Sequence, residues 1–409
     1  MPILLRIAPL LILFVISGLA ACDRASDPVL LAEPVPMTIQ VGPTVEGPRL
    51  SQGRDGQIVL SWMERLSIGG GALHFSELED GSWKNPTTVI NDPRMFVNWA
   101  DTPSVVPLAG DNWFAHWLSK TGKSTYAYGI QVSHSTDGGA TWSSPIAPHS
   151  DGTPTEHGFV SVSPGDDTTQ LIWLDGRKMV NEVSDDVAAT SMTLRGATVD
   201  ANGGIANAQL IDDVVCDCCS TEMATTLTGR VAVYRNRTTS EIRDIYSSRQ
   251  VNGEWQQGQP LSNDGWEIAG CPVNGPAVAA SDNFVAVAWF TAANDEPKVQ
   301  LRLSQDAGQS FGESILISAD NVMGQVDVEV LNGDSVVVSW LAENAQGSGD
   351  IRLATVSEDG KAGEETVGTT NYPRAVPQMT LDESGLLLAW TDREEDGNRL
   401  RTVRVPFVD

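Results

Sequence analysis

The sequence predicts an all-β fold, a β-propeller of seven blades with four antiparallel strands in each blade. The first observation is a short apolar run that ends in an aromatic residue and occurs seven times, at Trp62, Trp117, Trp173, Tyr234, Trp289, Trp340 and Trp390. These aromatics follow one another after 55, 56, 61, 55, 51 and 50 residues. The runs are rich in β-branched residues and bounded by turn residues, while no segment keeps a helical period. Such repeats are typical of propeller blades.

Each repeat predicts its strands in the same order. An alternating apolar run comes first, a turn with Gly, Asp or Asn follows, and the run that ends in the aromatic is the second strand. Two weaker strands complete the unit. The second strands read IVLSW, WFAHW, TQLIW, VAVY, VAVAW, VVVSW and LLLAW. The seventh copy favours seven blades over six, which is the alternative.

The two ends of the repeat array predict how the ring closes. The last repeat supplies only three strands, which read VPQMTL, LLLAW and RLRTVRV. The segment before the first repeat, PMTIQVG at residues 36–42, is a strand without a blade of its own. Because an unpaired edge strand invites association, we expect this N-terminal strand to complete the last blade. Residues 37–409 then form one propeller domain.

The N-terminus predicts export. Arg6 precedes an apolar run and small residues, the pattern of a secretory signal peptide over residues 1–21. The stretch LAAC at residues 19–22 resembles the lipobox of bacterial lipoproteins, which implies a lipid on Cys22. An ordinary signal peptide with an unrelated cysteine is the alternative. Residues 22–36, rich in Pro, Asp and Ala, are expected to be a tether. We therefore expect a protein anchored to a bacterial membrane, in the periplasm or on the cell surface.

The charge excludes some partners. The chain has 53 acidic and 26 basic residues, and its net charge is −27. Such a balance argues against nucleic acid and against an anionic lipid surface as partners. It agrees with a solvated acidic exterior, and the membrane is expected as a partner only through the lipid anchor. Nothing in the sequence indicates a protein partner.

Two turns have a specific sequence, STDGGATW at residues 135–142 and SQDAGQSF at residues 304–311. In each, an Asp can accept hydrogen bonds from its own turn, Gly permits positive φ, and an aromatic packs beneath. Both resemble the Asp-box of bacterial neuraminidase repeats, and most of residues 37–409 resembles the sialidase superfamily. The resemblance implies structural turns, with the matching positions Ser135, Asp137, Gly139, Trp142, Ser304, Asp306, Gly308 and Phe311.

The same resemblance implies a set of catalytic residues. An active sialidase needs three arginines for a carboxylate, a Tyr nucleophile paired with a Glu, and an Asp as acid and base. Two positions depart from this pattern, because Cys219 stands where the Glu is expected and Val376 where the Tyr is expected. Nearby residues substitute only if the strands are offset. The candidates are Arg49, Arg235, Arg374, Asp101, Glu222 and Tyr372.

Four cysteines are expected at the mouth of the central channel. Cys216 and Cys271 each lie 18 residues before the aromatic of their repeat, so they occupy equivalent positions in adjacent blades. Cys218 and Cys219 accompany the first of them, and His157 is expected beside the cluster. Three interpretations remain open: disulfides that include Cys216–Cys271, a Cu(I) or Zn(II) site, and a redox-active or substrate-contacting Cys218–Cys219 pair.

These observations predict a cell-envelope lipoprotein that binds a ligand, a glycan or a metal, at a channel mouth lined by Cys and Arg. The alternative is a sialidase-like glycoside hydrolase that acts on acidic glycans. The first is favoured because the Glu and Tyr positions of the family do not align, and fold alone does not fix function. The sequence leaves the cofactor unknown: copper or zinc fits reduced thiols, and none is expected if the cysteines form disulfides.

Overall fold

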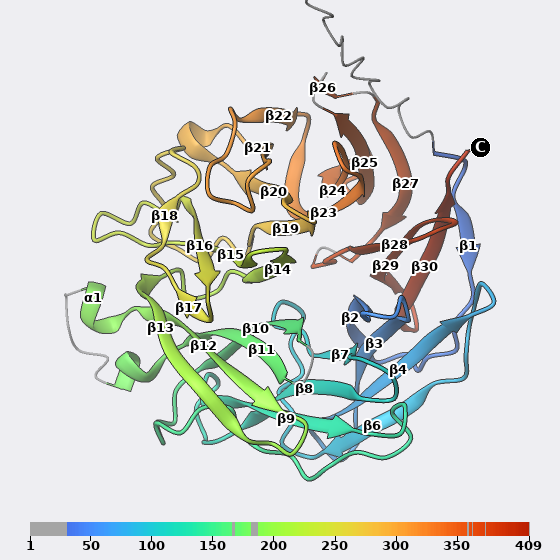
Figure 1. Cartoon of the computed structure of the whole chain (residues 1–409). Coiled ribbons are helices and arrows are strands. Elements are labelled where there is room, and N and C mark those ends of the chain that lie inside the picture. The colour runs from blue at the N-terminus through green and yellow to red at the C-terminus, as the bar shows by residue number, and fades with distance from the viewer. Residues whose placement is uncertain are drawn as a thin grey trace, which may run out of the picture.

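The computed structural model describes residues 31–408 except residues 166–167, 181–186, 358–359, 362 and 373. Seven antiparallel sheets stand around a central axis (Figure 1). Contacts between the innermost strands run from β2 through β7, β10, β14, β19, β23 and β28 and return to β2, so the ring is closed. The seven-bladed propeller is therefore confirmed. The expected signal peptide, Cys22 and most of the tether lie outside the described residues.

The first three blades come from the N-terminal half of the chain. The first blade contains β2 (Val45–Gln52), β3 (Ile58–Arg65), β4 (Gly71–Glu79), β5 (Ser82–Trp83) and β6 (Thr87–Asp92). The second contains β7 (Ser104–Pro107), β8 (Trp113–Lys120) and β9 (Tyr128–Ser135). The third contains β10 (His157–Pro164), β11 (Thr168–Asp175), β12 (Met192–Asp200) and β13 (Ile205–Val215).

The remaining blades follow in chain order. The fourth contains β14 (Glu222–Thr226), β15 (Gly229–Arg235), β16 (Ile245–Val251), β17 (Glu254–Trp255) and β18 (Gln259–Pro260). The fifth contains β19 (Ala277–Ser281), β20 (Phe284–Thr291), β21 (Lys298–Ser304) and β22 (Ile315–Ser318). The sixth contains β23 (Val322–Asn332), β24 (Ser335–Glu343), β25 (Gly349–Ser357), β26 (Gly360–Lys361) and β27 (Glu365–Thr370).

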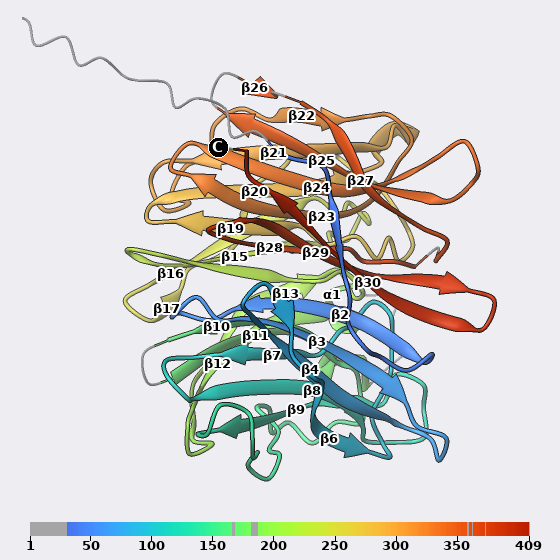
Figure 2. The same ribbon diagram turned by 90° about the vertical axis from the view of Figure 1, so that its right-hand side faces the viewer.

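The seventh blade joins the two ends of the chain. It contains β28 (Gln378–Asp382), β29 (Gly385–Glu394), β30 (Gly397–Pro406) and, outermost, β1 (Val35–Met37). β1 pairs antiparallel with β30, from Val35 opposite Arg404 to Met37 opposite Thr402 (Figure 2). The predicted closure by an N-terminal strand is confirmed, although this strand is shorter than residues 36–42 and begins one residue earlier.

Helices are few in the described part of the chain: the short helices η1 (Arg177–Val180), α1 (Val187–Thr190) and η2 (Ala293–Asp295). None of them has the length and apolar composition that crossing a membrane requires.

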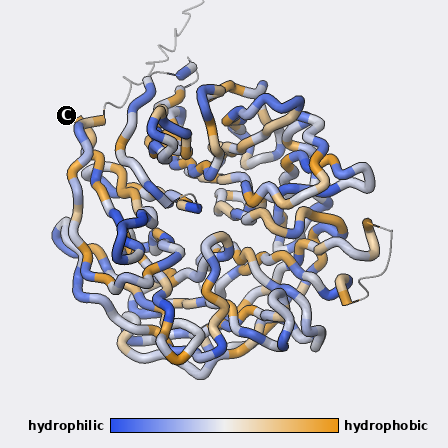
Figure 3. Tube along the Cα trace, turned by 180° about the vertical axis from the view of Figure 1, so that it is seen from behind, coloured by the Kyte–Doolittle hydropathy of each residue, from blue (hydrophilic) through white to orange (hydrophobic). Residues whose placement is uncertain are grey.

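The repeated aromatics explain the regular spacing of the sequence. They are 0–3% exposed, and each one belongs to an apolar cluster that its own blade forms with the preceding blade. Trp62, for example, packs with Leu387 and Ala389 of the seventh blade. Hydrophobic residues therefore occur in every blade around the ring (Figure 3). Each repeat supplies one large side chain to one interface between blades, which is why the aromatic recurs once per blade.

The two distinctive turns follow β9 and β21, the third strands of their blades. Asp137 accepts hydrogen bonds from the Thr141 backbone N–H at 2.8 Å and from the Thr141 hydroxyl at 2.6 Å. Asp306 makes the same pair of contacts with Ser310. Gly139 has φ +80°, and a Cβ there would lie 2.7 Å from the Phe75 ring, so both conformation and space require glycine. The hydrogen bonds of each Asp lie within its own turn, so we assign these turns a structural role in their blades.

Candidate functional site

The innermost strands bring three charged side chains into the central channel. Arg49 comes from β2, Glu222 from β14 and Asp327 from β23, and all three line one pocket, here called the channel pocket. Arg49 Nη2 lies 3.6 Å from Glu222 Oε1. A β-bulge precedes both Arg49 and Asp327, with a left-handed residue two positions earlier, Gly47 (φ 59°) and Gln325 (φ 54°). Bulges of this kind re-aim side chains, often at functional sites.

Backbone donors from the next blade hold both carboxylates. Glu222 Oε2 accepts from the Val278 N–H at 2.8 Å, and Asp327 Oδ2 accepts from the Met379 N–H at 2.7 Å. Burial raises the pKa of Glu222, while Arg49 opposes this shift. Burial and then the charge of Glu222 raise the pKa of Asp327 to about 8. Near neutral pH Asp327 is therefore protonated, and it lies near Glu222, the carboxyl group that Arg49 contacts.

Two further pockets open beside the channel pocket. The mouth pocket, about 460 Å³, is lined by Asn98, Trp99, Ala100, Ser124, Tyr126, Pro154, Thr155, Glu156, Phe159, Met179, Asp217, Cys218, Cys271 and Val273. The arginine pocket, about 720 Å³, is lined by Glu46, Arg65, Phe96, Val97, Asn98, Trp99, Thr125, Tyr126, Tyr372, Arg374 and Arg393. Trp99 lines all three pockets. They therefore form one continuous concave surface with this indole at the junction.

The predicted residues Tyr372 and Arg374 lie in the arginine pocket rather than in the channel. The Tyr372 hydroxyl donates to Glu46 Oε2 at 3.1 Å. Burial, and then the charge of Glu46, raises the pKa of Tyr372 to about 12, so this phenol stays protonated. The Arg374 guanidinium lies 5.6 Å from the centre of the Trp99 ring. The structure thus separates Tyr372 from Glu222, the pair that the sialidase resemblance implied as nucleophile and partner.

Arg235 does not line any of these pockets, which corrects the expectation that it binds a ligand. It is 1% exposed, and its guanidinium donates to the backbone carbonyls of Asn274, Arg243 and Phe290 at 3.0, 2.6 and 2.8 Å. The guanidinium also stacks on Trp266 at 4.8 Å. Because Arg235 ends the second strand β15 and not an innermost strand, it is directed between blades. Its donors are used to hold the blades together.

Asp101 is also buried beneath the site, at 1% exposure, and it lines none of the three pockets. Its Oδ1 accepts from the Phe159 N–H at 2.7 Å, and its Oδ2 accepts from the Tyr128 hydroxyl at 3.4 Å. Tyr128 also contacts Glu156, which does line the mouth pocket. Burial raises the pKa of Glu156 to about 7. The carboxyl group that faces the mouth pocket is therefore that of Glu156. Asp101 holds the backbone of Phe159.

The four cysteines lie near one another at the mouth pocket and all are unpaired thiols. Cys216 and Cys219 are buried with their sulfurs 3.1 Å apart. Cys218 contacts both and also Cys271, the exposed member from the adjacent blade. Burial opposes ionisation of Cys216, yet hydrogen bonds from Cys218 and Cys219 and the charge of Arg243 hold the pKa of its thiol well below the usual range.

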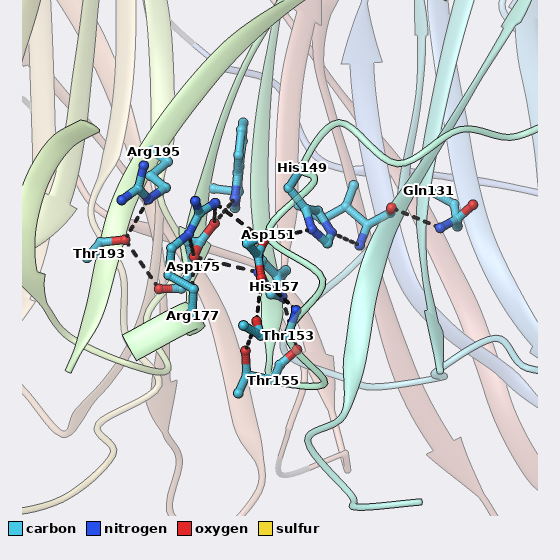
Figure 4. Close-up of polar contacts among 12 residues, drawn as sticks. Gln131, His149, Asp151, Thr153, Thr155, His157, Asp175, Arg177, Thr193 and Arg195 are labelled. Atoms are coloured by element: carbon cyan, nitrogen blue, oxygen red, sulfur yellow. Dashed lines mark hydrogen bonds and ion pairs between the residues drawn. The ribbon is translucent and has the colours of Figure 1, made fainter. Parts of the chain in front are cut away.

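His157 does not join the cysteines, which corrects a second expectation. Figure 4 shows its polar contacts with Asp151 and Asp175, whose carboxylates lie 3.0 and 3.6 Å from Nε2. Its Nδ1 lies 3.0 Å from the Thr155 carbonyl, and its ring stacks on His149 at 4.0 Å. Arg177 completes this buried group through two hydrogen bonds to Asp175. The group fixes the loop that supplies residues 154–156 to the mouth pocket.

Sequence reasoning missed two residues of the site, Asp327 and Glu156. A signal existed for the first: VDVEV at residues 326–330 alternates, which places Asp327 and Glu329 on one face of an innermost strand. Two carboxylates on one face of an otherwise apolar strand are unusual, and they therefore indicate a functional position. Glu156 has no such signal, because its place depends on the neighbouring blade. Arg243 does have one, since it stands in the charged segment RNRTTSEIRD at residues 235–244, which indicates a polar wall at the mouth.

The comparisons with known proteins agree on the fold. No protein-family model and no curated protein matches the chain. A protein from Dyadobacter fermentans is similar in structure with a TM-score of 0.53, 13% identity and coverage of 92% of this chain and 99% of that one. The GH93 alpha-L-arabinofuranosidase of Fusarium graminearum has a TM-score of 0.52, 15% identity and coverage of 92% and 98%. The polysaccharide lyase Uly1 has a TM-score of 0.52, 9% identity and coverage of 91% and 92%.

Sialidases are among the similar structures at a lower TM-score of 0.45, with 11–13% identity. At these identities the likeness concerns the fold. The comparisons therefore agree with the predicted propeller, and they leave the chemistry of the site to the residues themselves.

Proposed function

We propose that the chain is a cell-envelope protein that binds an acidic glycan across the arginine pocket and the channel pocket. The arginine pocket carries this proposal. Arg374 and Arg393 are exposed there, and among the described residues no carboxylate pairs with either guanidinium. Two unpaired arginines in one pocket are notable in a chain with 53 acidic and 26 basic residues. Guanidinium groups bind planar carboxylates through paired hydrogen bonds.

The aromatic residues of the same surface fit a sugar. Trp99 lies at the junction of the three pockets and Tyr126 lines the mouth and arginine pockets. Flat aromatic faces pack against the apolar face of a sugar ring while leaving its hydroxyls free. The arabinofuranosidase and lyase named above are carbohydrate-active by their names and share the fold, which supports a carbohydrate as the class of ligand. The site thus offers an aromatic platform flanked by positive charge.

Binding calorimetry on the purified chain tests this proposal. We expect oligosaccharides that end in a sialic or uronic acid to bind, and their neutral counterparts to bind at least about tenfold more weakly, the loss of one charge-assisted contact. Arg374→Ala and Arg393→Ala should each weaken binding. Arg404→Ala, which removes an arginine already paired with Asp382, is the control. Equal affinity for neutral and acidic sugars, or no loss in the pocket variants, would reject the proposal.

A second candidate, glycoside hydrolysis, is favoured by the channel carboxylates. Glycosidases use one protonated and one ionised carboxyl group, and the raised pKa of Asp327 beside the arginine-paired Glu222 supplies this asymmetry. Asp327 would give its proton to the leaving oxygen, and Glu222 would act as nucleophile or base. Release of reducing sugar from an acidic glycan, abolished by Asp327→Asn and by Glu222→Gln, would establish hydrolysis. Binding without turnover leaves the first proposal in place.

We also propose that Cys22 carries the lipid that anchors the protein. The support is the LAAC sequence after an apolar leader. In cells fed a labelled fatty acid, the protein should take up the label, and Cys22→Ser should abolish both labelling and membrane retention. Labelled Cys22→Ser protein would contradict this assignment.

A further inference from the structure

Three thiols converge on one point between the third and fourth blades. Cys216, Cys218 and Cys219 occupy the bend between β13 and β14, and their sulfurs all lie within 4.8 Å of one another. Two thiolates on one metal ion are roughly 4 Å apart when each metal–sulfur bond is about 2.3 Å. The three sulfurs are therefore within reach of one ion, and the 3.1 Å between the sulfurs of Cys216 and Cys219 has to widen to about 4 Å when the ion binds. In this arrangement Cys218 contacts both of its neighbours, so the three sulfurs form one group and not a pair plus one.

Asp217, the residue between Cys216 and Cys218, is not available as a metal ligand, so the possible ligands at the bend are sulfur atoms only. Asp217 accepts a hydrogen bond from the Met192 N–H at 3.2 Å and an ion pair from Arg237 at 2.8 Å. Its carboxylate is thus occupied by other partners. His157, the imidazole expected here, is held in its own group with Asp151 and Asp175. Soft ions prefer such thiolate sets, whereas hard ions require oxygen ligands.

A buried arginine lies beside one thiol of the cluster and stabilises the ionised form of Cys216. Arg243 Nη1 lies 3.2 Å from Cys216 Sγ, and its Nη2 is fixed by Glu241 at 2.9 Å. The thiolate is the metal-binding form of cysteine, and a cation beside it favours that form. Hydrogen-bond donors to ligand sulfurs are a common feature of metal–thiolate sites. Arg243 also offsets the negative charge that three thiolates and one monovalent ion would carry.

The position of Cys271 distinguishes a Zn(II) site from a Cu(I) site, because it determines whether three or four thiols can bind the ion. A structural zinc site is closed by four protein ligands in a tetrahedron. Cys271 contacts Cys218 but is exposed at the rim, and it is not a member of the converging group. We propose that Cys216, Cys218 and Cys219 bind one Cu(I) ion, and that Cys271 is the outer thiol through which the ion enters from the mouth pocket. Binding replaces thiol protons with the ion and involves no electron transfer. This site is independent of the glycan proposal.

An anaerobic titration tests the site. The full chain is exported, extracted in detergent without chelator, and given Cu(I) in competition with a chromophoric Cu(I) chelator. We expect one Cu(I) per chain with sulfur as the only neighbour in X-ray absorption. Cys216→Ser or Cys219→Ser should weaken binding more than about 100-fold, whereas Cys271→Ser should weaken it less than about tenfold, the scale of an outer partner.

Matched controls separate the site from the fold. Met37→Leu removes a sulfur from β1, away from the three pockets, and should leave the affinity for Cu(I) unchanged. Circular dichroism of each Ser variant verifies that it is folded, and Arg243→Lys gives a second measure, because a weaker affinity is expected with all thiols present. Peptide mapping after alkylation counts the free thiols. A disulfide between any two cluster cysteines, a four-cysteine zinc complex that Cu(I) does not displace, or equal loss in Cys271→Ser and Cys219→Ser would overturn the proposal.

Discussion

The guanidinium of Arg235 shows how much of a residue's role depends on the strand that carries it. The sequence predicts its place at the end of a second strand, and the structure agrees. Its direction was not predictable, because the three carbonyl groups that it binds belong to Asn274, Arg243 and Phe290, two of them in the next blade. Arg49, by contrast, lies on an innermost strand, and its side chain lines the channel.

Substitution of Arg235 should therefore affect stability rather than binding. Arg235→Ala leaves three buried carbonyl groups without a donor, and we expect the free energy of unfolding to fall by about 3–5 kcal/mol. Arg235→Lys should recover only part of this loss, since one ammonium cannot reach three separate carbonyls. Urea denaturation measures the change. A folded Arg235→Ala protein with normal stability but no glycan binding would contradict the structural role.

The pKa of Asp327 predicts a pH dependence of stability at the residue scale. Its value rises from an ordinary 3.8 to about 8 in the folded chain, chiefly through burial. Between these two values the unfolded chain has lost the proton that the folded chain keeps, so stability falls as pH rises through this window. Asp327→Asn should flatten that fall. Melting temperatures of both proteins from pH 4 to pH 9 check this, and parallel profiles would contradict it.

At the scale of elements, both the first and the second strands of the repeats were predictable, but the direction of the side chains on the innermost strands was not. IVLSW and its six counterparts are buried apolar runs whose aromatic fills an interface between blades, so composition alone locates them. β2, β10 and β23 contain bulges, and these irregularities aim Arg49 and Asp327 into the channel. A bulge shifts the side chains that follow it to the opposite face, so alternation such as VDVEV gives the shared face of Asp327 and Glu329 but not which face points into the channel. The site was therefore predicted less completely than the fold.

The loop before β10 depends on the group formed by His157, Asp151, Asp175 and Arg177. Asp175→Asn removes one of the two carboxylates of this group. Arg177 then loses its ion pair with Asp175, and His157 loses one of its two carboxylate neighbours. We expect a loss of about 3 kcal/mol in stability, the scale of a broken buried ion pair. Hydrogen exchange should become faster across residues 149–156, because this loop is held by the same group. Unchanged exchange in the loop would show that other contacts hold it.

At the scale of the whole molecule, seven similar blades produce one asymmetric site. The even spacing of the aromatics in the sequence predicts the ring, because each repeat places one aromatic in the interface with the preceding blade. The site, however, combines Arg49, Glu222 and Asp327 from the first, fourth and sixth blades, which are far apart in sequence. Only ring closure makes them neighbours. Two contacts join the ends of the array, the packing of β28 against β2 and the pairing of β1 with β30, and we expect the site to depend on both.

Removal of β1 tests this dependence. A chain that begins at residue 38 lacks the outermost strand of the seventh blade and exposes the edge of β30, so we expect a lower melting temperature and a tendency to self-associate. Its backbone hydrogen bonds, worth about 1 kcal/mol each, set the loss at roughly 2–4 kcal/mol. A chain that begins at residue 31 retains β1 and is the matched control, since both lack the leader. Calorimetry and light scattering compare the two. If both truncated chains have the same melting temperature and remain monomeric, β1 does not stabilise the blade. The innermost contacts between β28 and β2 then keep the ring closed by themselves.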